Sequence, residues 1–159
     1  MKNIEHHPFF LGLEARLFYY INADTSSNYM TRTSSWRRKT FENAIKWIPF
    51  PCEDGITSWS DRVYDNEDIY GVYNYNPIIF DENGMSVIIN YARTDESYLR
   101  FCKNVALHMR GKLQSSVAKT FIEVQRLWPG FQSLLHEAMV DAGLNTILTW
   151  NTSLVLSFL

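Results

Sequence analysis

The sequence predicts a single α+β domain with a central, mostly antiparallel sheet and flanking helices. Two segments rich in Val, Ile, Tyr and Phe, residues 71–80 and 85–91, are joined by a turn that contains Asn83-Gly84. Such a turn between β-rich segments is typical of a hairpin. Helical periodicity follows beyond residue 94. Because 159 residues bury one core comfortably but not two, we expect residues 1–159 to form one domain.

The N-terminal part combines one ambiguous segment with one clear helix. Residues 8–21 are apolar with few polar breaks, so both a helix and a strand fit them. Residues 22–35 are rich in Ser, Thr and Asn, which predicts a polar loop. Apolar residues then recur at helical spacing from Trp36 to Trp47, and Ser35 can cap this helix.

The middle of the chain is expected to supply the hairpin. Residues 52–68 are polar and acidic, which favours a loop. Proline cannot donate a backbone hydrogen bond, so Pro77 predicts that the first strand lies at an edge or carries a bulge.

Three helices and a strand are predicted in the C-terminal part. Thr94 can cap a helix from Asp95 to Met109, with carboxylates in its first turn. Residues 113–128 and 131–142 continue the helical periodicity, with a break at Pro129-Gly130 and an end at Gly143. An apolar strand, Thr146–Trp150, leads into Asn151.

Composition limits the classes of partner. The formal charge of -2 gives no overall reason to expect nucleic acid as a partner. The sequence contains no run of ~20 apolar residues and begins without an apolar signal-like segment, so we expect a cytoplasmic protein without a membrane partner.

His136-Glu137 starts like a helical zinc motif, but Val140 occupies the position of the second histidine. No metal site is therefore predicted.

The segment from Arg110 to Ser116 is the best candidate for a ligand site. A glycine-containing loop that opens a helix can direct backbone N–H groups at an anion, and Arg110 and Lys112 add positive charge. Gly111 is equally well explained as a helix cap, so both interpretations stay open.

Together with the segments around it, this loop resembles part of the GCN5-related N-acetyltransferase family. The resemblance covers residues 70–159: a hairpin, an Arg-Gly loop, a helix, a strand and a terminal segment led by Asn151. That last segment, Asn151-Thr152-Ser153 to Phe158-Leu159, is similar to the end of divergent acetyltransferase-like proteins of tailed phages. The resemblance implies an acyltransferase-like fold, and the host cytoplasm as location if the chain is phage-encoded.

The family relationship would assign roles to particular residues. It implies acetyl-CoA as cofactor, with its phosphates held at Arg110, Gly111, Lys112, Gln114 and Ser115 and its pantetheine arm at Asn151. A carboxylate near the hairpin, Glu82 or Asp95, would deprotonate an amine substrate. Leu113 stands where the family has a second glycine, so the resemblance implies either an N-acyltransferase or an inactive relative.

A small non-catalytic interaction protein, such as a phage accessory, inhibitor or immunity protein, is the alternative. It accounts for the high aromatic content of 15% and for the absence of a recognisable catalytic set. The aromatic residues lie among acidic ones, which suits a basic partner protein. The predicted partner surface consists of Trp59, Tyr64, Tyr70, Tyr73 and Tyr75. The same residues would equally well build a core around the hairpin.

Overall fold

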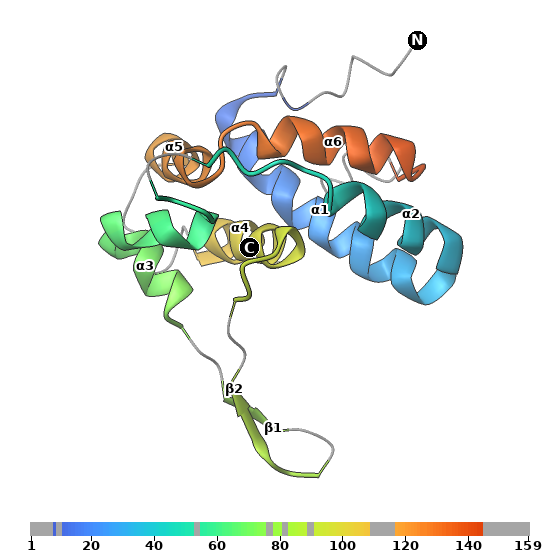
Figure 1. The fold of residues 1–159 in the computed structure, drawn as a ribbon, viewed down its shortest axis with the longest axis horizontal. Coiled ribbons are helices and arrows are strands. Elements are labelled where there is room, and N and C mark those ends of the chain that lie inside the picture. Colours follow the sequence, from blue (N-terminus) through green and yellow to red (C-terminus); the bar gives the residue numbers. More distant parts are fainter. Residues whose placement is uncertain are drawn as a thin grey trace.

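The computed structural model describes Pro8 and residues 11–52, 55–75, 78–80, 83–88, 91–108 and 117–144. Within these residues the chain is predominantly helical, with only two short strands (Figure 1). In chain order the elements are α1 (Leu13–Thr33), α2 (Ser35–Ile45), the 3-10 helix η3 (Trp59–Asp65), α3 (Glu67–Tyr73), β1 (Ile78–Phe80), β2 (Ser86–Ile88), α4 (Asp95–His108), α5 (Val117–Leu127) and α6 (Phe131–Asp141). The predicted α+β fold with a central sheet, and hence its acyltransferase-like architecture, is wrong.

The two strands form a hairpin at the edge of the molecule. They pair antiparallel, with Ile78 opposite Ile88 and Phe80 opposite Ser86, and Gly84 in the turn has a φ of 72°. Figure 1 shows this hairpin extending away from the helical body. A hairpin therefore exists around the predicted turn, but it is an appendage rather than the centre of the fold.

Helix α1 is longer than the sequence pattern predicts. It includes most of the segment 22–35 that was expected to be a loop, and residues 13–21 of the ambiguous segment before it are helical. Ala23, Asp24 and Ser26 are buried, so one side of this polar half packs inside the molecule, while Tyr29 is 62% exposed. The polar side chains bond locally, as when the hydroxyl of Ser27 donates to the carbonyl oxygen of Asp24 at 2.8 Å. Tertiary packing thus overrides the weak helix propensity of Ser and Asn.

Helices η3 and α3 occupy the segment in which a loop and the start of a strand were predicted. Ser58 and Asp61 form a reciprocal capping box at the start of η3. At the start of α3, the side-chain oxygen of Asn66 accepts from the backbone N–H of Ile69 at 3.0 Å. Carboxylates in the first turn of α3 favour the helix further. These local signals outweigh the β propensity of the Val and Tyr residues that follow.

The predicted start of α4, the break between α5 and α6 and the end of α6 are confirmed, whereas the predicted helix end at Gly111 lies outside the described residues. The backbone N–H of Ser97 donates to the hydroxyl of Thr94 at 3.3 Å, as expected of a cap on α4. Gly130 separates α5 from α6 with a φ of 80°. Gly143 ends α6 in the left-handed region, and the N–H of Leu144 reaches back to the carbonyl oxygen of Met139 at 2.8 Å.

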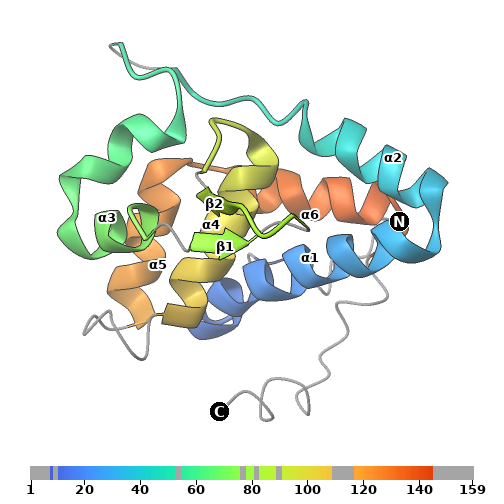
Figure 2. The same ribbon diagram turned by 90° about the horizontal axis from the view of Figure 1, so that it is seen from below.

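The core is formed where α4 crosses α1, with α5 beside them (Figure 2). One side of this core is aromatic and centres on Trp59, which is 1% exposed. Its ring centroid lies 5.0 Å from that of Phe101 and 5.1 Å from that of Tyr98. Tyr98 continues the cluster toward Phe131 at 4.7 Å. We call this group the Trp59 cluster; it comprises Trp59, Tyr73, Tyr91, Tyr98, Phe101, Trp128 and Phe131.

Replacing Trp59 with Ala should lower the free energy of unfolding by about 3–5 kcal/mol, because it leaves a ring-sized cavity in the core. The matched control is Trp47→Ala, since Trp47 is 85% exposed and its loss should cost less than about 0.5 kcal/mol. Urea denaturation of both variants measures the difference. Equal effects of the two substitutions would contradict the central position of Trp59.

Candidate functional site

Most residues of the predicted acyl-CoA site lie outside the described part of the chain. These are Glu82, Arg110, Gly111, Lys112, Gln114, Ser115 and Asn151, and the predicted strand at residues 146–150 lies outside it as well. Asp95 is the one predicted site residue that the structure describes, as the first residue of α4. The described residues therefore do not test whether the proposed base lies beside the proposed cofactor loop.

Asp95 has an unusual protonation equilibrium. Its carboxyl group is half-buried, and burial, together with the neighbouring charge of Glu96, raises its pKa to about 6. A carboxyl with such a pKa can exchange protons near neutral pH. The pocket described below is lined by its neighbours Glu96 and Ser97, but not by Asp95 itself. Within the described part of the chain, Asp95 therefore lies beside this pocket but not in its wall.

The raised pKa predicts a pH dependence of stability. Because the folded carboxyl holds its proton more tightly than the unfolded one, whose pKa is near 3.8, stability should fall as pH rises from about 4 to about 6. Asp95→Asn should remove this contribution. Thermal unfolding of both proteins across this pH range gives a difference curve. Parallel curves between pH 4 and 6 would show that Asp95 titrates normally.

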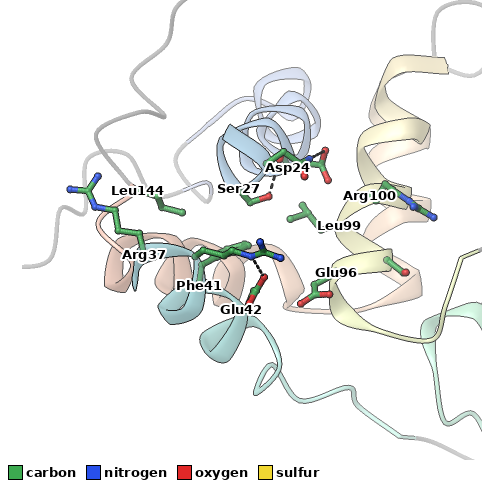
Figure 3. A pocket seen from close by; sticks show the side chains of 12 residues that line it. Asp24, Ser27, Arg37, Phe41, Glu42, Glu96, Leu99, Arg100 and Leu144 are labelled. Carbon is green, nitrogen blue, oxygen red and sulfur yellow. Dashed lines mark hydrogen bonds and ion pairs between the residues drawn. The ribbon is translucent and has the colours of Figure 1, made fainter. Parts of the chain in front are cut away.

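A polar pocket of about 310 Å³ lies between α1, α2 and α4 (Figure 3). Its lining residues are Asp24, Ser27 and Asn28 from α1, Arg37, Arg38, Phe41 and Glu42 from α2, Glu96, Ser97, Leu99 and Arg100 from α4, and Leu144. The sequence reasoning missed this site because it placed the α1 residues in a loop. Their spacing of three and four residues, which puts them on one helical face, was the available signal.

Charges in the pocket are largely balanced by neighbouring charges. The Nζ atom of Lys103 lies 2.6 Å from Oδ2 of Asp24, and Nε of Arg38 lies 2.6 Å from Oε1 of Glu42. The bond to Glu42 raises the pKa of Arg38, and the charge of Glu96 adds to this effect. With three arginines and three carboxylates in its wall, the pocket presents both signs of charge. It can accommodate a small polar molecule, but it is not a strong site for a simple anion.

The predicted aromatic surface divides into a buried and an exposed part. Trp59 belongs to the core, so its prediction as a contact residue is wrong. Tyr70 and Tyr73 are half-buried against the core. Tyr64 and Tyr75 are exposed, and the Tyr64 ring lies 5.3 Å from that of Tyr70.

Acidic residues follow the exposed Tyr64 closely in sequence on η3 and α3. Asp65, Glu67 and Asp68 are all exposed and lie within four residues of Tyr64. We call this surface the η3–α3 face; it consists of Tyr64, Asp65, Glu67, Asp68 and Tyr70. It combines an exposed aromatic ring with exposed carboxylates, of which Asp65 is paired with Arg126.

Two arginines hold the η3–α3 face against α5. The guanidinium of Arg62 donates to the carbonyl oxygen of Arg126 at 3.1 Å, and Arg126 donates in return to the carbonyl oxygen of Arg62 at 3.2 Å. Arg126 also forms an ion pair with Asp65 at 3.0 Å. Because these bonds join segments more than 60 residues apart in sequence, the face is held firmly against the helical body.

Compared with protein-family models, curated proteins and solved structures, the chain matches none of them. The resemblance to acetyltransferases therefore stays a prediction from sequence.

Within the described ranges, no group of three or more His, Cys, Asp or Glu side chains is arranged to hold a metal ion. None of the helices described is long and apolar enough to cross a membrane.

Proposed function

We propose that this chain is a small protein-binding domain whose partner docks on the η3–α3 face. The observation that carries this proposal is an exposed tyrosine, Tyr64, whose ring lies tilted beside that of Tyr70, with acidic residues next to it in sequence. Tyrosine is enriched at protein interfaces because its large ring makes contacts at low entropic cost. At 64% exposure, Tyr64 has most of its ring available to a partner.

The charge of the face specifies the chemistry of the partner. Glu67 and Asp68 favour a protein surface rich in Lys and Arg, which they would attract and orient during encounter, whereas Asp65 is paired with Arg126. The Arg62–Arg126 pair already holds the face in place in the free protein, so little conformational entropy is lost when a partner binds. Such a domain fits the class of inhibitor, immunity or phage accessory proteins. No comparable arrangement of described residues favours acyl transfer.

Photo-cross-linking tests the proposal in the cells that naturally produce the protein. A photoreactive amino acid at position 64 should give one dominant cross-linked species, whose cross-linked peptide is rich in Lys or Arg. The same probe at Glu137, exposed on α6, is the matched control and should not give this species.

Charge reversal at the face provides the second arm of the experiment. With the probe still at position 64, Glu67→Lys together with Asp68→Lys should reduce the yield of the species about tenfold, since like charges would then oppose docking. An equal yield of the cross-linked species from positions 64 and 137 would contradict the proposal. So would a yield that the charge reversal leaves unchanged.

A further inference from the structure

Two exposed tryptophans that the core does not use lie on α2 and just after its last residue. Trp36 is 60% exposed and Trp47 is 85% exposed. Phe41, Ile45 and Ile48 are buried, so the apolar side of this segment already faces the core. Large aromatic side chains left on the opposite side are costly to keep in water and often mark an interaction surface.

These tryptophans share one surface with two lysines. Positions 36 and 43 differ by seven residues, or about two helical turns, and so lie on the same side of α2. Trp47 follows the end of α2 in a tighter turn, in which its N–H donates to the carbonyl oxygen of Ala44 at 3.3 Å. Lys39 and Lys46 lie one turn or less from a tryptophan, and both are exposed. We call this surface the α2 stripe; it consists of Trp36, Lys39, Asn43, Lys46 and Trp47. The guanidinium of Arg37 lies over the Trp36 ring at 5.5 Å and adds further positive charge nearby.

The α2 stripe is complementary to the η3–α3 face. One surface combines exposed aromatic rings with lysines, and the other combines exposed aromatic rings with carboxylates. The lysines can pair with Glu67 and Asp68, while Trp36 or Trp47 can stack against Tyr64. Aromatic pairs of this kind contribute beyond the area that they bury.

The two surfaces lie at opposite ends of the molecule. Figures 1 and 2 both show α2 at one end of the long axis and α3 at the other. The α2 stripe and the η3–α3 face of one chain therefore cannot contact each other, whereas those of two copies can do so head to tail.

We propose that the α2 stripe of one copy docks on the η3–α3 face of a second copy, and that the chain associates with itself in this way. The inference rests on the proposed function and names a second copy as a partner of that face. The formal charge of -2 opposes such association only weakly. Because short helical surfaces bury less than the ~800 Å² per partner of a standard interface, the contact is weak and salt-sensitive.

A charge-swap experiment tests the contact by sedimentation velocity. The first variant carries Lys39→Glu and Lys46→Glu, which make the α2 stripe acidic. The second carries Glu67→Lys and Asp68→Lys, which make the η3–α3 face basic. The matched control carries Glu137→Lys and Asp141→Lys on exposed positions of α6, with the same change in net charge as the second variant.

The wild-type chain and the α6 control should associate at about 0.5 mM in low salt, and ~0.5 M salt should reverse the association. Each interface variant alone should stay monomeric, with its association weakened at least about tenfold. An equimolar mixture of the two should associate again, because the native face of the first meets the native stripe of the second. This rescue also shows that both variants are folded.

A wild-type chain that is monomeric at 0.5 mM, or an association that neither variant weakens, would overturn the inference. So would retention on anionic lipid vesicles that depends on Lys39 and Lys46 without self-association, since the stripe would then bind lipid. The proposed function is judged separately by the cross-link at position 64. If position 64 cross-links to a different protein while the wild-type chain is monomeric, the proposed function stands. Only the second copy is then ruled out as the partner of that face.

Discussion

The burial of Trp59 among aromatic rings is the interaction on which this structure depends. Trp59 begins η3, yet its ring packs on Phe101 and Tyr98 of α4 and on Tyr73 of α3. The indole N–H finds no acceptor among the described residues, so ring packing rather than hydrogen bonding holds the side chain. A helix as short as α3 is not stable alone in water. Its stability comes from the cluster, which joins the η3–α3 segment to the long helices.

The same packing explains how a short segment can present a binding surface. Side chains on one side of η3 and α3 enter the core, and this leaves Tyr64 and the neighbouring carboxylates facing outward. The Arg62–Arg126 pair fixes the other edge of the segment to α5. On α2 the division is similar, since Phe41 and Ile45 enter the core while Trp36 and Trp47 remain outside. The two proposed surfaces are thus the outward sides of helices whose inward sides build the fold.

Local signals in the sequence predicted the C-terminal helices well, because their boundaries are set by Thr94, Gly130 and Gly143. These local signals did not predict the structure of segments whose conformation is determined by tertiary packing. The polar half of α1 is helical because Ala23 and Asp24 are buried against other helices, which the composition of residues 22–35 does not reveal. The hairpin signal at residues 83–84 was real, but its size and position at the edge depend on the rest of the fold. For the site, the sequence indicated that the aromatic residues between Trp59 and Tyr75 form a group. It did not indicate which of them are buried, as Trp59 is, and which are exposed, as Tyr64 is.

Native-state hydrogen exchange of the α3 backbone amides tests most directly whether the Trp59 cluster holds this segment in place. The account predicts that the amides of residues 70–73 open with a free energy close to that of the amides in α4, because both depend on the same cluster. Fast exchange in α3, near the rate of an unfolded chain, while α4 stays protected would contradict it. The η3–α3 face would then lack the rigid support on which its proposed role depends.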